Sequence, residues 1–285
     1  MRILVTGVKG QLGYDCVREL KERGFTDVVG IDINDLDLTD EIAVRKYLTK
    51  LRPDVILHNA AWTAVDLAEQ HENEVRKINV DAVKYIARTA EEIDAKLVYI
   101  STDYVFPGKG EQFYEVDDNT GPSNVYGKSK LDGEKAAKSC KKTFIIRISW
   151  AFGLNGNNFV KTMLKLAENH NELSIVDDQI GSPTYTYDLS KLICDMIETD
   201  KYGIYHATNE GICSWADFAE EIFKISKLNV KVNRITTAEY LKNKPVQALR
   251  PLNSRLSKKA LDDAGFARLP AWQDALQRYL KEITK

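Results

Sequence analysis

The chain has 285 residues, of which 44% are hydrophobic and 29% charged, and its formal net charge is −2. This composition is typical of a globular protein and excludes general nucleic-acid binding, which needs an excess of Lys and Arg to neutralise phosphates. The absence of a long apolar run, of a signal-peptide pattern and of paired cysteines predicts a cytoplasmic protein with no membrane partner, disulfide framework or zinc site.

Short apolar runs alternate with longer amphipathic ones through the first half of the chain. The apolar runs predict strands at 2–6, 28–32, 54–59, 96–101 and 143–149. The amphipathic runs predict helices at 11–24, 41–51, 72–93 and 125–138, the second of them capped by Thr39. This alternation is typical of a parallel sheet covered on both faces. The predicted fold class is therefore α/β, with a Rossmann-like doubly wound parallel sheet.

The pattern becomes less regular beyond residue 150. Helices are expected at 158–169, 187–198, 214–226 and 271–283, with short strands near 173–176 and 203–207. Ser214 and Asp217 have the spacing of a capping box at the start of one of these helices. We expect a larger domain over 1–150, to which segments around 178–207 return, and a smaller α/β lobe over 151–285.

A glycine-rich turn follows the first predicted strand directly. In TGVKGQLG, Gly7, Gly10 and Gly13 surround Gln11 and Leu12. Glycine adopts positive φ freely and lets a pyrophosphate approach the backbone, while the next helix offers free N–H groups to an anion. Its place between a strand and a helix therefore predicts that this turn binds a dinucleotide. The alternative is a turn of this shape that holds no ligand.

An acidic residue stands where a dinucleotide-binding fold expects one. Asp32 ends the second predicted strand and matches the residue that binds the adenosine ribose hydroxyls. A carboxylate there would repel the extra phosphate of NADP, and 30–44 contains no Arg or Lys to attract it. We therefore predict NADH as the preferred cofactor, with NADPH as the alternative. Asp37 and Leu38 are further cofactor candidates, and a solvent-facing or helix-capping role is the alternative for Asp32.

Tyr126 and Lys130 lie four residues apart on the predicted helix 125–138 and so share one face. A lysine ammonium beside a phenol lowers the pKa of the phenol, which can then protonate a carbonyl oxygen as hydride arrives. The same spacing recurs at Tyr187/Lys191 and Tyr240/Lys244. Context distinguishes Tyr126, because it follows Thr102 at the carboxyl end of a strand, where open sheets place their ligands.

Two further groups end predicted strands. Thr102 offers a second hydroxyl donor to a substrate carbonyl. Asn59, Ala60 and Ala61 follow the third strand, where small residues let the backbone pass close to a dinucleotide. The Asn59 side chain is expected to hold this loop through hydrogen bonds.

These motifs together resemble the extended short-chain dehydrogenase/reductase family, through TGVKGQLG (6–13), NAAWTAVD (59–66), STDYVF (101–106) and YGKSK (126–130). Further segments resemble the dTDP-4-dehydrorhamnose reductase branch and extend over nearly the whole chain. They are STDYVFPGKG (101–110), NVYGKSKLDGE (124–134), RISWAFG (147–153), NNFVKTML (157–164), DQIGSPTYTYDL (178–189) and RPLNSRLS (250–257).

The resemblance implies an oxidoreductase that reduces the 4-keto group of dTDP-4-dehydro-β-L-rhamnose to dTDP-L-rhamnose with NAD(P)H. Thr102, Tyr126 and Lys130 fall on the catalytic triad of the family. Tyr126 would protonate the new alkoxide, Lys130 would tune Tyr126 and bind the nicotinamide ribose, and Thr102 would polarise the carbonyl. The domain over 1–150 would bind NAD(P), and the lobe over 151–285 would bind the sugar nucleotide.

The resemblance also implies a substrate pocket. Asp103, Tyr104 and Trp150 would line the sugar site, with core packing as the alternative for Trp150. Asn158 and Arg250 are candidates for the nucleotide diphosphate, with a surface ion pair as the alternative for Arg250. Two polar candidates of the DQIGSPT segment are Gln179 and Thr184. Trp62 departs from the family pattern and is expected to alter the shape of the pocket.

The same resemblance bears on the oligomeric state, on a metal site and on alternative functions. The resemblance allows a homodimer and a bridging Mg²⁺, for which Asp15 and Asp188 are candidates, but no clear ligand set supports a metal site. An epimerase or dehydratase would share the Tyr–Lys pair, although a dehydratase needs an acidic pair after Thr102. A non-catalytic regulatory subunit of the same fold can lose the Tyr–Lys pair, whereas this chain retains Thr102, Tyr126 and Lys130.

Overall fold

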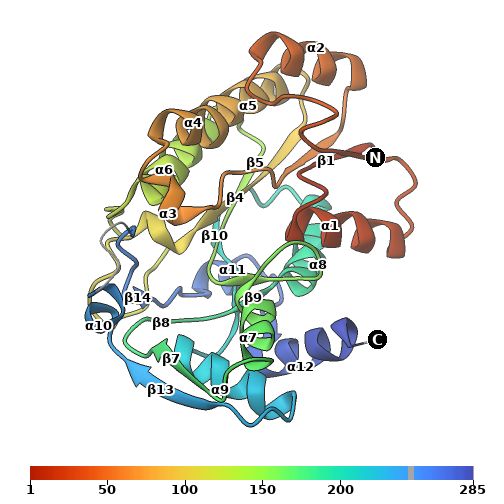
Figure 1. Ribbon diagram of the computed structural model, residues 1–285. Helices are drawn as coiled ribbons and strands as arrows, with labels where there is room; N and C mark the ends of the chain where they lie inside the picture. The colour runs from red at the N-terminus through yellow and green to blue at the C-terminus, as the bar shows by residue number, and fades with distance from the viewer. Residues whose placement is uncertain (243–246, 285) are drawn as a thin grey trace.

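In the computed structural model, which describes residues 1–242 and 247–284, six parallel strands form a central sheet (Figure 1). The strand order is β10-β5-β4-β3-β1-β2. The strands are β1 (Ile3–Thr6), β2 (Val28–Ile31), β3 (Val55–His58), β4 (Lys96–Thr102), β5 (Thr143–Ile148) and β10 (Gly203–His206). Since the strand order reverses direction between β1 and β3, the carboxyl ends of these two strands form the topological switch point, where open sheets bind ligands.

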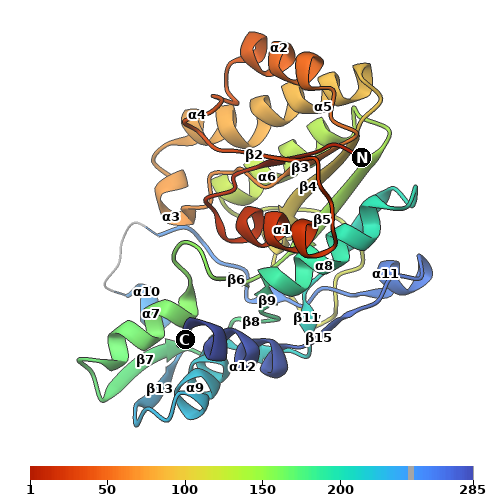
Figure 2. The ribbon, with the colours of Figure 1, turned by 90° about the vertical axis from the view of Figure 1, so that its right-hand side faces the viewer.

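Helices cover both faces of this sheet, because successive side chains of a strand point to opposite sides. Ile3 and Val5 pack in one buried cluster with α1 (Gln11–Glu22) and α8 (Thr186–Ile197). Leu4 packs in another cluster, which belongs to the opposite face. The helices that contribute to it are α2 (Glu41–Leu51), α5 (Ala82–Glu92) and α6 (Val125–Ala137). Figure 2 shows strands between two helical layers, and the predicted doubly wound fold is confirmed.

The second half of the chain contributes to this layer and also builds a second core. β10 completes one edge of the sheet beside β5, and α8 lies next to α1. The second core is formed around α7 (Phe159–Ala167), α9 (Trp215–Ile225) and α12 (Trp272–Ile283). Beside it, β7 (Glu172–Val176) pairs in parallel with β13 (Lys231–Ile235), as Figure 1 shows. The predicted capping box of Ser214 and Asp217 begins α9 and is confirmed.

Several short elements complete the fold. The paired strands are β6 (Ala151–Phe152) with β9 (Thr184–Tyr185), β8 (Ile180–Gly181) with both β12 (Cys213–Ser214) and β14 (Asn253–Ser254), and β11 (Asn209–Glu210) with β15 (Leu269–Ala271). The short helices are α3 (Val65–Ala68), α10 (Thr237–Leu241), α11 (Lys259–Asp263) and the 3₁₀ turn η2 (Asp103–Val105). None of the helices in the described part of the chain is long and apolar enough to cross a membrane.

Two local predictions need correction. The cap of α2 is Asp40 and not Thr39, because the Asp40 side chain accepts from Ala43 N while the Thr39 hydroxyl donates to Asp37. The predicted helix 72–93 is not uniform. It consists of α4 (Glu72–Arg76), a π-helical turn η1 (Lys77–Asp81) and α5.

The π-helical turn carries Asn79, whose buried side chain bonds to two other segments. The Asn79 Oδ1 atom accepts from Trp62 N at 2.8 Å, and its Nδ2 atom donates to Trp62 O and to the Ser129 hydroxyl. Asn79 thereby joins the loop after β3 to helix α6. Single π-helical turns are frequent beside functional sites.

Candidate active site

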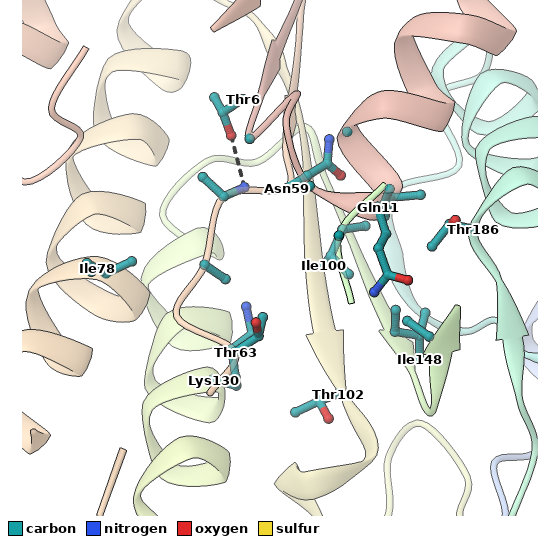
Figure 3. A pocket seen from close by; sticks show the side chains of 18 of the residues that line it. Thr6, Gln11, Asn59, Thr63, Ile78, Ile100, Thr102, Lys130, Ile148 and Thr186 are labelled. Atoms are coloured by element: carbon teal, nitrogen blue, oxygen red, sulfur yellow. Dashed lines mark hydrogen bonds between the residues drawn. The ribbon is translucent and has the colours of Figure 1, made fainter. Parts of the chain in front are cut away.

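A cavity of about 840 Å³ opens at the carboxyl ends of the central strands. Its walls come from the turn after β1, the loops after β2 and β3, the end of β4, helix α6 and the segment after β5. Trp215, the first residue of α9, closes one side and brings the second core to the site. Figure 3 shows the side chains of Gln11, Asn59, Thr102 and Lys130 around this cavity.

The glycine turn is shaped to approach another backbone closely. Gly7 has a φ of +69°, and a Cβ atom there would lie 2.9 Å from Ala60 N. A Cβ atom at Gly13 would collide with the Gly7 carbonyl oxygen. Helix α1 begins after Gly10 without a side-chain cap and without an acidic residue in its first turn. The first N–H groups of α1 therefore have no side chain bound to them at the end of the helix that meets the cavity, as an anion site requires.

The loop after β3 lies directly against the glycine turn and lines the same part of the cavity. Ala60 N donates to the Thr6 hydroxyl at 3.2 Å, the bond drawn in Figure 3. Asn59, Ala60 and Ala61 all line the cavity, and Asn59 Nδ2 donates weakly to Leu57 O. Asn59 Oδ1 is buried and has no hydrogen-bond partner within the described residues. This orphaned acceptor and the glycine cradle fit a bound dinucleotide, because a ligand donor would satisfy the oxygen.

Asp32 lies at the rim of the same cavity, beside the glycine turn. Its Oδ2 atom accepts from Lys9 N at 2.9 Å and its Oδ1 atom from Ile33 N, so the carboxylate also fixes the glycine turn. Leu38 and Asp37 line this end too, but the Asp37 carboxylate accepts from Thr39 N and from the Thr39 hydroxyl. The structure thus brings the predicted adenosine-binding residues together around Asp32. Leu12 and Gln11 complete the lining near the start of α1.

The Tyr–Lys pair enters the cavity from α6. Asn124 caps this helix by accepting from Gly127 N at 2.7 Å, which fixes the first turn that carries Tyr126. The Tyr126 ring meets the Tyr104 ring edge-on, with 5.5 Å between the ring centroids. Thr102, at the end of β4, lines the same part of the cavity. The structure therefore brings Thr102, Tyr126 and Lys130 together.

The electrostatics of this pair differ from the expectation. Burial lowers the pKa of Lys130 to about 7, against the opposing effect of Glu134. The Lys130 ammonium nitrogen lies 4.2 Å from the centroid of the Tyr99 ring. Burial and the nearby Asp103 carboxylate raise the pKa of Tyr126, with the Thr102 hydroxyl acting in the opposite direction. The net change in the pKa of Tyr126 is therefore upward, opposite to the lowering predicted from Lys130, and Tyr126 is protonated at neutral pH.

The far end of the cavity is aromatic and acidic. Asp103, Tyr104 and Trp150, the residues predicted to bind the sugar, all line it, and Trp150 has a φ of +50°. The Trp150 ring stacks on Trp215 with 3.9 Å between centroids and 18° between planes. Positive φ is costly for a bulky side chain, so the surrounding packing must hold Trp150 in place.

Trp215 was not predicted as a site residue. Its Nε1 atom donates to Gln179 Oε1 at 3.1 Å, and Gln179 Nε2 donates to the Thr237 hydroxyl. Gln179 itself is not among the cavity-lining residues and acts on the site through Trp215. The only signal in the sequence was a large aromatic residue directly after the Ser214 cap, which is also compatible with core packing.

A buried ion pair behind the cavity was also missed. Glu134 accepts from Arg147 Nε and Nη2, both at 2.8 Å, and from the Ser101 hydroxyl at 2.5 Å. Both charged side chains are only 3% exposed. Glu134 lies one turn after Lys130, so the face that carries Tyr126 and Lys130 could have predicted it.

Several predicted residues lie away from the cavity. Asn158 caps α7, accepting from Lys161 N, and its amide donates to Gln11, Gly153 and Tyr279. Both the amide nitrogen and the oxygen of Asn158 are therefore engaged within the fold, and the structure does not place Asn158 on the cavity.

Arg250 also lies outside the cavity lining and forms an ion pair with Asp66 at 2.8 Å. Trp62 packs against His71 and donates to Ala64 O, so it does not shape the pocket as expected. Thr184 donates to Ser149 O at 2.6 Å and is not in the lining.

The remaining predicted residues have structural partners. Asp188 binds Arg278 through both of its oxygens, at 2.8 and 2.7 Å. Within residues 1–242 and 247–284, no group of three or more His, Cys, Asp or Glu side chains could hold a metal ion. Tyr187 donates to Glu22, and Lys244 lies outside the described residues.

Comparisons with known proteins cover the whole chain. Residues 1–285 match the family described as RmlD substrate binding domain. The chain is 43% identical to the spore coat polysaccharide biosynthesis protein SpsK of Bacillus subtilis, over 99% of this chain and 97% of that protein. It is 40% identical to the dTDP-4-dehydrorhamnose reductase of Aggregatibacter actinomycetemcomitans, over 97% of each.

Solved structures give the same similarity. A dTDP-4-dehydrorhamnose reductase from Clostridium acetobutylicum is 40% identical, with a TM-score of 0.96 and full coverage of both chains. The reductase from Bacillus anthracis, solved in complex with NADP, is 40% identical with a TM-score of 0.94 over 99% of each chain. Structures of a UDP-glucose 4-epimerase and a dTDP-glucose 4,6-dehydratase share the fold at 17% identity each.

Proposed function

This chain belongs to the RmlD family, with the dTDP-4-dehydrorhamnose reductases, and we propose that it reduces the 4-keto group of dTDP-4-dehydro-β-L-rhamnose to dTDP-L-rhamnose with NAD(P)H. The observation that carries the proposal is the meeting of Thr102, Tyr126 and Lys130 in the cavity that also holds the glycine turn. A reductase needs a proton donor and a dinucleotide site next to each other, and this cavity offers both.

The cofactor site is assigned to the glycine turn, Asn59 and Asp32. The first N–H groups of α1 would bind the pyrophosphate, and Asp32 would accept from the adenosine ribose hydroxyls. When bound, the nicotinamide would supply a hydride, which is one hydrogen nucleus with two electrons, to the carbonyl carbon of the substrate. Lys130 is buried deep in the cavity, where its ammonium group would bind the nicotinamide ribose.

Tyr126 supplies the proton that completes the reduction. As the carbon–oxygen double bond becomes single, the oxygen takes the phenolic proton, and Tyr126 recovers a proton from solvent afterwards. The raised pKa of Tyr126 keeps the phenol protonated before the reaction, which is the state that a reductase requires. Asp103, Tyr104 and Trp150 surround the place left for the sugar.

We propose that the two halves of the chain bind different ligands, as the sequence predicts. Residues 1–150, with segments around 178–207, would form the NAD(P)-binding domain, since α8 and β10 pack into its layers. Residues 151–285 would form the smaller sugar-nucleotide-binding lobe, which reaches the cavity through Trp215. An enzyme that draws on NAD(P)H and a nucleotide sugar fits a cytoplasmic location.

The experiment that tests the function uses purified protein, NADH or NADPH, and dTDP-4-dehydro-β-L-rhamnose made in situ by the matching epimerase. The expected result is loss of NADH absorbance that depends on the epimerase, with dTDP-L-rhamnose as product. Tight binding of the dinucleotide without oxidation of either cofactor would contradict the proposal. It would point to another keto-sugar substrate or to a non-catalytic subunit.

A further inference from the structure

The Lys130 side chain has an unusual environment for a charged group. It is only 4% exposed, and within residues 1–242 and 247–284 its ammonium nitrogen forms no ion pair or hydrogen bond. A charge that is removed from water is costly unless another group compensates for the lost hydration. The group that lies against this ammonium is the aromatic ring of Tyr99.

Tyr99 contacts Lys130 at two points. The ammonium nitrogen of Lys130 lies 4.2 Å from the centroid of the Tyr99 ring, and the Tyr99 hydroxyl donates to Lys130 O at 3.2 Å. The face of an aromatic ring carries partial negative charge, so a cation within about 6 Å of its centroid is attracted. The ring therefore supports the ammonium end of Lys130, and the hydroxyl fixes the helix backbone at the same residue.

The Tyr99 ring is itself held by the elements packed around it. A Cβ atom at Gly133 would lie 2.2 Å from the Tyr99 hydroxyl oxygen, so α6 approaches this closely only because residue 133 is glycine. The His58 ring stacks on Tyr99 with 6.2 Å between centroids, and burial lowers the pKa of His58 to about 3, which keeps it neutral. Burial also raises the pKa of the Tyr99 phenol well above its ordinary value. Lys130 is therefore placed on a fixed and uncharged aromatic surface.

The carboxylate one turn further along α6 has other partners. Glu134 accepts from Arg147 through both of its oxygens and from the Ser101 hydroxyl. It forms no ion pair with Lys130 and acts on it only through its charge, which opposes the lowering of the Lys130 pKa by burial. The Tyr99 ring is therefore the group in direct contact that favours the ammonium form of Lys130.

A ring and a carboxylate would leave this ammonium in different states. A carboxylate takes up lysine N–H groups in charge-assisted hydrogen bonds, whereas the face of a ring attracts the charge and leaves N–H groups for a ligand. Lys130 lines the cavity, as Figure 3 shows, and Tyr99 does not. We infer that Tyr99 is a positioning residue for the reaction: its ring holds the Lys130 ammonium at the cavity wall with N–H groups available to the nicotinamide ribose. The inference rests on the proposed reductase function and adds to the triad a residue that acts only through Lys130.

The test is a double-mutant cycle on NADH affinity, measured by calorimetry. Tyr99→Met replaces the ring with an apolar chain, and the dissociation constant for NADH should rise by about tenfold, between the effects of exposed and desolvated cation–π contacts. Tyr99→Phe retains the ring and should stay within about twofold of the wild type. In a Lys130→Met background, Tyr99→Met should add less than about twofold, because no ammonium remains for the ring to hold.

Phe144→Met is the matched control for the loss of a buried ring. Phe144 lies on β5, is fully buried and packs in the cluster that contains Ile3 and Val5, away from the cavity lining. This variant should leave NADH affinity unchanged. An equal loss of affinity from Tyr99→Met with and without the Lys130 ammonium would overturn the inference, because Tyr99 would then act through the fold alone. A Tyr99→Phe variant as weak as Tyr99→Met would overturn it too.

A second measurement requires neither cofactor nor activity and can be made on the wild type. Lysine labelled with ¹³C at the ε carbon is incorporated, and the Lys130 resonance is identified by its loss in Lys130→Met. A ring face 4.2 Å from the ammonium nitrogen should shift the ε protons upfield in the wild type and in Tyr99→Phe, but not in Tyr99→Met. An unshifted Lys130 resonance in the wild type would overturn the inference. An inactive wild type that shows both the shift and the coupling would reject only the proposed function.

Discussion

The two ends of the cavity are built in different ways. The cofactor end consists of loops that directly follow β1, β2 and β3, so each of its residues lies a few positions from a strand. The proposed sugar end brings together Trp150 and Trp215, which come from two separate segments of the second half of the chain. One end depends on local backbone geometry and the other on how distant segments pack.

This difference determines which substitutions should damage which function. At the cofactor end, a single added Cβ atom meets backbone, which cannot move without opening the turn. At the sugar end, side chains meet side chains, which can adjust at smaller cost. Tyr126 and Lys130 on α6 line the same cavity, and loss of the Tyr126 hydroxyl alone should leave both binding functions largely intact.

Tyr126→Phe should have the largest effect on turnover. It removes the proton donor and keeps the ring that packs against Tyr104. General acid catalysis contributes about 10²–10⁴-fold, so kcat should fall by that order while NADH binding is nearly unchanged. The measurement is steady-state kinetics together with a fluorescence titration of NADH. A variant within about threefold of the wild type would remove Tyr126 from the mechanism, because the lower end of that range is about 10².

Gly13→Ala should damage the cofactor end selectively. The added methyl group would collide with the Gly7 carbonyl oxygen, so the turn must open and its N–H groups lose their alignment. NADH affinity should fall by about tenfold or more, equivalent to at least ~1.4 kcal/mol. Gly121→Ala is the control, because its Cβ would meet Pro107 at an ordinary distance of 3.7 Å. Equal affinities in both variants, measured by calorimetry, would show that the turn does not bind the dinucleotide.

Asp32→Asn should change cofactor choice more than turnover. The wild type is expected to have the higher kcat/KM with NADH, although the related Bacillus anthracis reductase was solved with NADP. Replacing the carboxylate weakens a charge-assisted hydrogen bond to the ribose worth about 1.5–3 kcal/mol and removes repulsion of the extra phosphate. The NADH to NADPH ratio of kcat/KM should therefore fall by about tenfold. A wild type that prefers NADPH would contradict the assigned role of Asp32.

The cofactor end could be predicted because glycines in the sequence indicate where the backbone adopts positive φ or passes too close to its neighbour for a Cβ atom. Gly7, with its positive φ, and Gly13, where no Cβ fits, show these two requirements at their own positions. Tyr126 and Lys130 were also predictable, since helical spacing places them on one face and their position after Thr102 distinguishes them from the other pairs with this spacing. The alternation of strands and helices similarly predicted the doubly wound sheet.

The sugar end could be predicted only in part, for the opposite reason. Trp215 reaches the cavity directly after β12, a strand of two residues that is too short to show a periodic pattern. Asn158 was assigned to the diphosphate, but an asparagine before a helix is also a good cap, and in this fold its side chain caps α7 and bonds to Gly153 O. The sign of the pKa change of Tyr126 was missed because it depends on burial and on the position of Asp103.

Trp215→Leu should produce the smallest effect, and it tests whether the sugar end really extends into the second core. The variant removes the stack on Trp150, and aromatic pairs contribute about 0.5–1.5 kcal/mol. The KM for the sugar nucleotide should therefore rise by about two- to tenfold, while the KM for NADH stays the same. Trp62→Leu is the matched control, because Trp62 packs against His71 outside the cavity lining. If Trp62→Leu raised the sugar KM and Trp215→Leu did not, the wall formed by α9 would have no part in binding. Near-ultraviolet circular dichroism would show independently whether the stacked indoles were lost, since only the Trp215 variant removes that pair.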